Sequence, residues 1–247
     1  MMAQDKRALM EPLFSRIAVR DALSEGEKQA LVAAAVDQRS YAAGNTIARE
    51  GDAPATSMLL VRGLAARVGY VQDGGRQITT FHIAGDFLDL NAFVLKRLDH
   101  GVVALSACDC LILPHAALLE ITETHPHLTR MLWLSTLLDG AIHRQWLLVH
   151  GRMDAREHMA HLFCEMFERS RAAGIATSSS FPFPLTQSDL ADAMGMSSVH
   201  VNRTLQALRA EGLLSWDGIT AEIQDRERLM RFAQFDPAFL HLYQRQR

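Results

Sequence analysis

Cysteine is scarce in this sequence, and its apolar runs are short. The chain of 247 residues has three cysteines, an odd number without the spacing of a disulfide framework. That usage is typical of a reducing compartment and predicts no structural disulfides. No segment approaches the roughly 18 apolar residues of a membrane-spanning helix, and the opening residues contain no apolar signal segment. We therefore expect a cytoplasmic protein without a membrane partner.

Catalytic motifs are also missing. The sequence contains no nucleophile elbow, no phosphate-binding loop and no pair of carboxylates in a recognisable setting. The formal net charge of −3 argues against loose coating of nucleic acid. It is compatible with a site-specific binder whose positive charge is confined to one helix. The expectation is a binding protein rather than an enzyme, with no cofactor.

Histidine, in contrast, is frequent, with 11 residues. His158, His161 and Cys164 recur at steps of three within one expected helix and could line up as metal ligands. Such steps drift around a helix, however, and no carboxylate completes the set on that face. His125 and His127 lie in an expected loop and give no stronger case for a metal or a haem. We predict no metal site.

Size and composition favour two domains, because an apolar fraction of 49% suffices for two ordinary cores. Ser24 and Glu27 have the spacing of a capping box and predict a short helix over residues 24–36. From Tyr41 to Pro114, short β-branched and apolar runs alternate with turn signals such as Gly85-Asp86. That texture is typical of an antiparallel sandwich or barrel.

A long helix is predicted after Pro126, where apolar residues recur at alternating steps of three and four. The members of this seam are Leu128, Met131, Ser135, Leu138, Ile142, Gln145 and Val149. We expect the apolar ones to join a second copy of the chain, while the opposite apolar side, with Leu134, Leu137, Ala141 and Leu148, packs on the sheet. The alternative is that the seam itself packs on the sheet of its own chain.

The helical pattern is interrupted at Gly151, and Asp154 with Glu157 then predicts a new helix start. This helix runs to about Arg171, and residues 172–180 form a loop of low complexity. The expected organisation is a β-rich domain over residues 1–125, a dimerisation helix over 126–150 and a second domain over 151–247.

The second domain contains the pattern of a helix-turn-helix. Thr186 is an N-cap for a helix over residues 187–194, and Ser197 caps a second helix over 198–210. Such a motif needs a small residue where the helices touch, a glycine in the turn and a β-branched residue in the second helix. Ala191, Gly195 and Val201 stand at these places. The alternative is a helical hairpin without a ligand.

A hairpin is predicted directly after this motif. Gly212 ends the second helix, and apolar residues on either side of Asp217-Gly218 give a strong two-residue hairpin signal. The expected strands cover residues 214–216 and 219–223. A hairpin in this place is typical of the wing of a winged helix-turn-helix.

The whole chain resembles the CRP/FNR family of bacterial transcription regulators. The resemblance rests on Gly44-x-x-Ile47-x-x-x-Gly51-Asp52, Gly63 and Gly85-Asp86-Phe87, and on Leu185-Thr186-Gln187, Asn202-Arg203 and Gly212-Leu213-Leu214. It covers roughly residues 12–224 and implies an α+β fold: an N-terminal double-stranded β-roll, a long dimerisation helix and a C-terminal winged helix-turn-helix.

The residues that form two kinds of sensor site in the family are missing from this chain. Members that bind cyclic AMP grip its phosphate with an Arg-Ser or Arg-Thr pair, but this chain has Asp99-His100-Gly101 there. Lys96 and Arg97 lie nearby in a different register. The iron–sulfur branch needs cysteines near the N-terminus, and none precedes Cys108. Cys108 and Cys110 are interpreted as half-buried small hydrophobic residues on one face of a strand.

The resemblance implies binding to double-stranded DNA as a homodimer, at a palindromic promoter site and with RNA polymerase as a partner. The effector is an unidentified small molecule or is absent. The alternative is a sensor module that acts through protein contacts. The absence of acidic residues between Ser197 and Ala210 favours DNA binding. The predicted DNA-binding residues are Thr186, Gln187, Ser197, Ser198, Val199, His200, Asn202 and Arg203. The predicted dimerisation residues are Leu128, Met131, Leu138, Ile142 and Val149.

Aligned with the family, Arg203 takes the position that usually donates to guanine. Four residues earlier the family usually has a glutamate that accepts from cytosine, but this chain has Val199. Thr186, Gln187, Ser197 and His200 are expected to contact phosphates.

Overall fold

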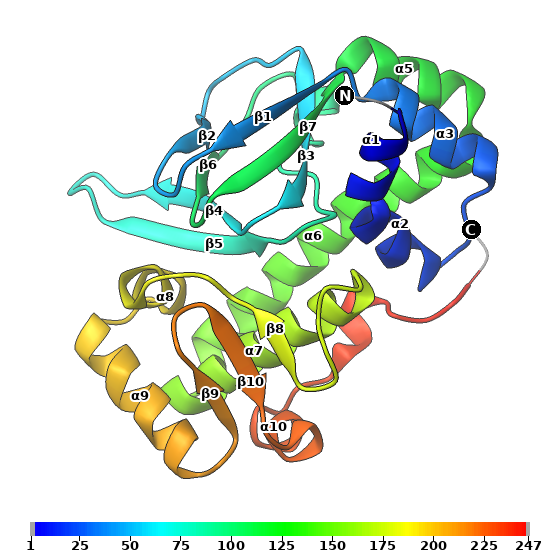
Figure 1. The fold of residues 1–247 in the computed structure, drawn as a ribbon. Coiled ribbons are helices and arrows are strands. Elements are labelled where there is room, and N and C mark those ends of the chain that lie inside the picture. The colour runs from blue at the N-terminus through cyan, green and yellow to red at the C-terminus, as the bar shows by residue number, and fades with distance from the viewer. Residues whose placement is uncertain (1–2, 246–247) are drawn as a thin grey trace.

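The computed structural model describes residues 3–245 and contains two groups of strands with helices around them (Figure 1). The N-terminal half contains α1 (Ala3–Leu9), α2 (Glu11–Ala18), α3 (Glu25–Ala34), β1 (Asp37–Tyr41), β2 (Thr46–Ala48), β3 (Thr56–Arg62), β4 (Ala65–Tyr70), β5 (Arg76–His82), α4 (Ala92–Leu95), β6 (Gly101–Ala104) and β7 (Cys108–Pro114). Next come α5 (His115–Thr124), α6 (Pro126–Arg152) and α7 (Ala155–Ala172). The C-terminal half contains β8 (Ser180–Pro182), α8 (Gln187–Met194), α9 (Ser198–Ala210), β9 (Leu214–Trp216), β10 (Thr220–Ile223), α10 (Arg226–Phe232) and the 3-10 turn η1 (Pro237–Leu240).

The predicted antiparallel β-roll is present. Its two sheets have the strand orders β1-β7-β3 and β2-β6-β4-β5, and every pairing in them is antiparallel. Alternate side chains of β7 fill the space between the sheets, because successive residues of a strand point to opposite faces. Cys108 and Cys110 belong to this filling, as small hydrophobic residues, and are fully rather than half buried. Burial raises the pKa of the Cys110 thiol to about 12.

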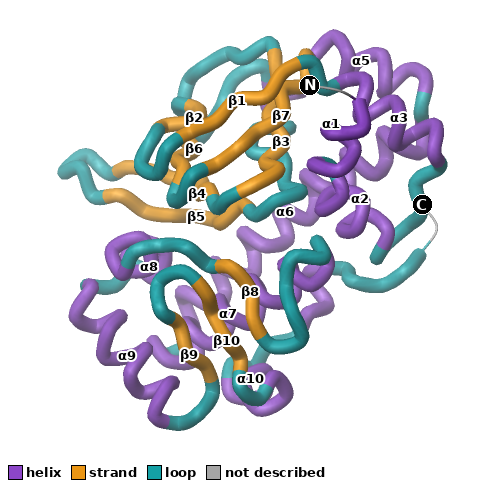
Figure 2. Tube along the Cα trace, in the orientation of Figure 1, coloured by secondary structure: helices purple, strands orange, loops and turns teal. Residues whose placement is uncertain are grey.

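Three N-terminal helices cover one side of the β-roll, and only one of them is predicted from the sequence. That helix is α3, whose N-terminus has the expected capping box between Ser24 and Glu27. Helices α1 and α2 pack with α3, α5 and the start of α6 in one hydrophobic cluster. In Figure 2 these helices form a purple layer beside the orange strands.

Helix α6 connects the two strand groups (Figure 1), and its faces are used only partly as predicted. On the side expected to pack on the sheet, Ala141 is buried and Leu134 packs against the cluster of N-terminal helices. The residues proposed to join a second copy are buried in their own chain: Leu128, Met131, Leu138, Ile142 and Val149. Leu128 and Met131 pack in the cluster that contains α2, and Ile142 packs in a cluster that extends into the C-terminal half. The seam is therefore packed within its own chain, as in the alternative: α2, which was not predicted, covers its start, and the β-roll with the C-terminal half covers its later part.

The exposed side of α6 is also apolar. Trp133 is 65% exposed, Leu137 55%, Leu147 76% and Leu148 54%. Two of these, Leu137 and Leu148, are among the residues expected to face the sheet. The helix also continues through Gly151 and ends only where Met153 becomes extended. The following helix α7 begins at the predicted capping box of Asp154 and Glu157.

The C-terminal half packs directly on the β-roll. One hydrophobic cluster contains residues of β4 and β5 together with residues of α7, β8, α8 and α9. The ring of Phe81 on β5 meets the ring of Phe183 edge to face, with 5.3 Å between centroids. Strand β8 begins within the loop predicted for residues 172–180, and it pairs with β10 in a small sheet of order β8-β10-β9. A strand of three residues shows no detectable periodicity in the sequence.

Candidate nucleic-acid interface

The first helix of the motif is α8, and its ends are those predicted. Thr186 accepts a hydrogen bond from the Asp189 amide, and the Asp189 carboxylate accepts from the Thr186 amide and hydroxyl, which completes a capping box. The helix ends at Gly195, whose φ of 64° lies in the left-handed region. Glycine adopts this conformation without steric cost, so α9 can turn away sharply.

Helix α9 has one buried face and one exposed face. Its buried residues, Val201, Thr204, Leu205 and Leu208, face the rest of the C-terminal half. Ser197 caps its N-terminus by accepting a hydrogen bond from the His200 amide. The other face presents Ser198, Val199, Asn202 and Arg203 to solvent, and Val199 is 81% exposed. An exposed valine is unusual on a helix that has an apolar face available to bury it.

The hairpin after α9 has the geometry of a wing. Strands β9 and β10 pair in antiparallel register around Asp217-Gly218, as predicted. The Asp217 carboxylate accepts hydrogen bonds from the amides of Ile219 and Thr220, and these bonds lower the pKa of Asp217. Ile219 is 67% exposed at the tip and lies outside the strand predicted to begin with it.

The exposed face of α9 contains basic and neutral residues only. No acidic residue occurs from Ser197 to Ala210, and Arg203 and Arg209 are both exposed. Arg209 donates to the carbonyl oxygen of Trp216 and so ties α9 to the wing. Arg203 forms no ion pair within residues 3–245, which leaves its guanidinium free for an external acceptor.

The predicted DNA-binding residues gather at two helix N-termini. Thr186 and Gln187 are exposed at the start of α8, although the Thr186 hydroxyl is also used in the cap. Ser197, Ser198, Val199, Asn202 and Arg203 are exposed on the first half of α9, and His200 is half-buried. The arrangement can offer backbone amides and short polar side chains to phosphates, with longer side chains beyond them.

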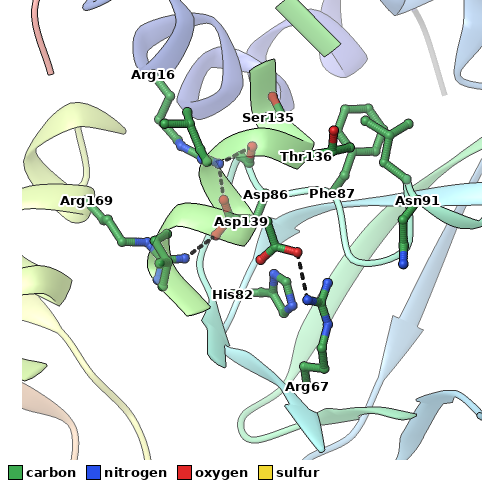
Figure 3. A pocket seen from close by; sticks show the side chains of 14 residues that line it. Arg16, Arg67, His82, Asp86, Phe87, Asn91, Ser135, Thr136, Asp139 and Arg169 are labelled. Atoms are coloured by element: carbon green, nitrogen blue, oxygen red, sulfur yellow. Dashed lines mark hydrogen bonds and ion pairs between the residues drawn. The ribbon is translucent and has the colours of Figure 1, made fainter. Parts of the chain in front are cut away.

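A buried charged network between the halves was not found by sequence reasoning (Figure 3). Asp86 of the Gly85-Asp86-Phe87 turn accepts from Arg16 on α2 and from Arg169 on α7, the latter at 3.0 Å. Arg169 also donates to Glu165 at 2.9 Å. Burial acts to raise the pKa of Asp86, but the two guanidinium groups hold it at about 2. The partners are far apart in sequence, so no local pattern could reveal them.

Arg16, Asp86 and Arg169 line a cavity that also contains Arg67 and His82 from the β-roll. Arg67 donates to Asp139 on α6 at 2.7 Å. Burial, followed by the nearby Arg67 charge, lowers the pKa of His82 to about 3, so this imidazole is neutral. Each of the three guanidinium groups in this region lies beside a carboxyl group, that of Asp86, Asp139 or Glu165.

The residues around the position where cyclic-AMP-binding members of the family have a phosphate-gripping arginine contact other groups of the protein. Asp99 is largely exposed and pairs with the buried His100 at 2.6 Å. Lys96 donates to the Phe93 carbonyl oxygen and Arg97 to that of Gly51. Asp89, in the turn before them, is buried and one of its oxygens accepts the Met58 amide.

Of the histidines considered as metal ligands, His158 and His161 are buried, whereas His125 and His127 are half-buried. His127 lies in α6 rather than in the expected loop, and its ring contacts Glu27 and Asp21. His161 lies 3.2 Å from the Gln145 amide nitrogen and packs between Phe235 and Phe239. Over residues 3–245, no three histidine, cysteine or acidic side chains are grouped as metal ligands. Within the same range, no helix is both long and apolar enough to cross a membrane.

Two family models match the chain. One, described as a Crp-like helix-turn-helix domain, matches residues 157–232. The other, described as a cyclic nucleotide-binding domain, matches residues 38–125. Together they include the β-roll and the candidate interface, in the order found in the structure.

Several characterised proteins are similar to the chain. The transcriptional activator protein FnrL of Cereibacter sphaeroides is 29% identical over 185 residues, covering 73% of this chain and 73% of FnrL. The fumarate and nitrate reduction regulatory protein of Escherichia coli is 21% identical over 222 residues, covering 89% and 88%. The solved structure of FixK2 from Bradyrhizobium japonicum has a TM-score of 0.71 at 23% identity, covering 79% of this chain and 96% of FixK2. The structural similarity supports the fold.

Proposed function

The chain belongs to the CRP/FNR family of transcription regulators, and from this premise we propose that it binds a palindromic promoter site as a homodimer in the cytoplasm. It reads the duplex with α9 in the major groove, without a cyclic nucleotide, and it works with RNA polymerase at the promoter. The observation that carries the proposal is the exposed, acid-free face of α9 with the unpaired Arg203.

Arg203 is the residue proposed to read a guanine. An arginine fork donates two parallel hydrogen bonds to the O6 and N7 acceptors of guanine in the major groove. An arginine already paired inside the protein would have to break that contact first, and Arg203 has no such pair among the described residues. Val199, one turn earlier on the same face, offers an apolar surface that suits a thymine methyl group.

Phosphate contacts are assigned to the two helix starts. Gln187 at the start of α8 and Ser197 at the start of α9 lie where backbone amides point outward and the helix dipole is positive. These contacts fix the register of α9 in the groove but do not distinguish bases.

The experiment that tests this function is selection of bound duplexes from a random DNA pool. We expect an enriched palindrome with a G·C pair in each half-site and half-site centres about 34 Å apart. Competition against unselected duplex of equal length then measures specificity at one stated salt concentration. Failure to enrich any sequence would contradict sequence-specific binding.

The dimer is proposed to form through the exposed stripe of α6, defined as Trp133, Leu137, Leu147 and Leu148. Exposed apolar side chains that lie on one side of a long helix favour a helical partner. A second copy is the partner that places two α9 helices around a twofold axis. The buried seam predicted from the sequence cannot serve, because α2 and the C-terminal half already cover it.

Light scattering at micromolar concentration should give twice the chain mass. Leu137→Glu and Leu148→Glu should each shift the protein to the monomer, because a carboxylate would be buried at the helix pair. Leu119→Glu is the matched control, since Leu119 is also about half exposed but lies on α5. A wild-type monomer, or dissociation by the control alone, would contradict this interface.

Cyclic AMP and cyclic GMP are proposed not to bind. Asp99 and His100 stand where a phosphate-gripping arginine is needed, and the nearby Lys96 and Arg97 are engaged with backbone carbonyl oxygens. Titration calorimetry should detect no heat of binding with either nucleotide. Micromolar affinity for one of them would overturn this part of the proposal.

A further inference from the structure

Strand β5 and helix α8 are joined by a pair of salt bridges. Arg76, the first residue of β5, donates through Nη2 to Asp189 at 2.6 Å and through Nε to Asp192 at 2.7 Å. Asp189 and Asp192 lie about one turn apart on α8, so one planar guanidinium spans both carboxylates. The contact joins the β-roll to the first helix of the DNA-binding motif, 113 and 116 residues away in sequence.

Two further hydrogen bonds support the other end of α8. The Ala193 carbonyl oxygen, in its last turn, lies 3.4 Å from the Gln77 amide nitrogen and 3.1 Å from His150 Nε2. Gln77 follows Arg76 on β5, and His150 belongs to α6. We call this set of contacts from Arg76, Gln77 and His150 to α8 the α8 clamp.

The salt bridges are shielded from water. The side chains of Arg76 and Asp192 are about a quarter exposed, and that of Asp189 is 11% exposed. Burial acts to raise the pKa of Asp189, but hydrogen bonds from Thr186 and Arg76 hold it below its ordinary value. Hydrogen-bonded ion pairs have a directional geometry, whereas the apolar contacts beneath them are non-directional.

Asp189 links the clamp to the end of α8 that faces DNA. One oxygen of its carboxylate faces Arg76, and the other closes the capping box at Thr186. A shift of Asp189 away from Arg76 would therefore also move the helix start to which phosphate contacts are assigned. In the clamped orientation, the base-contacting face of α9 remains exposed.

We propose that Arg76 is a positioning residue for DNA recognition, which holds α8, and with it α9, against the β-roll in the orientation that binds DNA. The inference rests on the proposed DNA-binding function. Two half-sites are read together only when both α9 helices have a fixed spacing, and a freely tilting motif would have to be ordered at each binding event. Arg76 itself touches no base.

A purely electrostatic role of Arg76 makes a different prediction. Losing one positive charge near DNA weakens binding, and losing one negative charge strengthens it. Arg76→Ala and Asp192→Asn change the charge in opposite directions, yet both open the clamp. If the clamp matters, both variants should bind the selected duplex more weakly.

The test measures affinity for the duplex enriched by the wild type, by fluorescence anisotropy at fixed salt. We expect a loss of about tenfold for Arg76→Ala and about threefold for Asp192→Asn, in the range of coupling between distant sites. Asp192 is chosen because Asp189 is also needed for the helix cap. The matched control is Arg62→Ala, which breaks the single Arg62–Asp109 pair within the β-roll. Its affinity should stay close to that of the wild type.

Orientation is measured separately, with spin labels at Asp73→Cys near the β4–β5 turn and Gln206→Cys on α9. Labelled chains are diluted with unlabelled chain, and the native cysteines are buried. The distance distribution should be narrow in the wild type and broader in both clamp variants. Unchanged affinity and distances in Arg76→Ala, or tighter DNA binding by either clamp variant, would overturn the inference. If the wild type bound no DNA, the proposed function would fail, while broader distances would still support the clamp.

Discussion

Helices α6 and α9 are both long enough to be identified from the sequence, but only α9 is used as its pattern predicts. On α9 the apolar residues lie on one face and are buried, so the remaining polar face must meet solvent or a ligand. On α6 two faces are apolar, and the structure buries the one expected to join a second copy. A helix with a single apolar face can bury only that face, so its pattern determines its orientation. A helix with two apolar faces can bury either one, and its orientation depends on the elements that pack beside it.

The two helices should differ most in how far truncating one of their apolar side chains lowers the free energy of unfolding. Leu128 on α6 is 0% exposed, and Val199 on α9 is 81% exposed. Leu128→Ala should lower the free energy of unfolding by about 3–5 kcal/mol, because a cavity remains in a packed core. Val199→Ala should change it by less than about 0.5 kcal/mol.

Urea denaturation followed by circular dichroism measures both values at one protein concentration. An equal, small effect of both substitutions would mean that the Leu128 face of α6 is not packed on its own chain.

Asp89 in the N-terminal half and Asp217 in the C-terminal half should make the free energy of unfolding change with pH in opposite directions. Burial raises the pKa of Asp89 to about 7, while backbone amides lower that of Asp217 in the wing. Between about pH 4 and 7 the unfolded chain has lost the Asp89 proton and the folded chain keeps it. The Asp89 contribution to folding is therefore complete at low pH and is lost as pH rises to about 7, at up to about 1.4 kcal/mol per pH unit.

The measurement is the difference in unfolding free energy between wild type and Asp89→Asn across this window. The variant should gain relative stability with rising pH and level off above about pH 7. Asp217→Asn serves as the exposed control. A difference that does not depend on pH would show that Asp89 is ionised throughout.

On the exposed face of α9, the largest effect is expected at Arg203. Arg203→Ala should remove about 1–3 kcal/mol of discrimination at one G·C pair in each half-site, because a bidentate contact is lost. Gln187→Ala is the comparison, since a phosphate contact should weaken all sequences alike and reduce the salt dependence. Competition binding with single-base variants of the selected site measures both. Equal losses on all sequences for Arg203→Ala would exclude base reading by this residue.

A smaller and more local effect is expected at Val199. Val199→Glu introduces an acceptor for the cytosine N4 amine and should change the preferred base at a single position of the half-site. The preferred base facing Arg203 should stay the same. Repeating the selection with this variant checks the result, and an unchanged consensus would mean that α9 lies in a different register in the groove.

The motif itself followed from local chemistry, which is why it could be predicted residue by residue. The caps at Thr186 and Ser197, the left-handed Gly195 and the Asp217-Gly218 turn each depend on backbone groups a few residues away. The capping boxes at Ser24 and Asp154 are of the same kind. Such features are determined within a short stretch of chain, so the sequence contains all the information needed to find them.

The tertiary structure alone decided which surfaces meet. Helix α2 has no side-chain cap at its N-terminus, and it covers the start of the α6 seam that periodicity assigned to a partner chain. The Arg76 salt bridges and the Arg16–Asp86–Arg169 network join residues that are distant in sequence. Periodicity shows that a side chain is apolar or charged, but burial and pairing depend on which element the fold brings beside it.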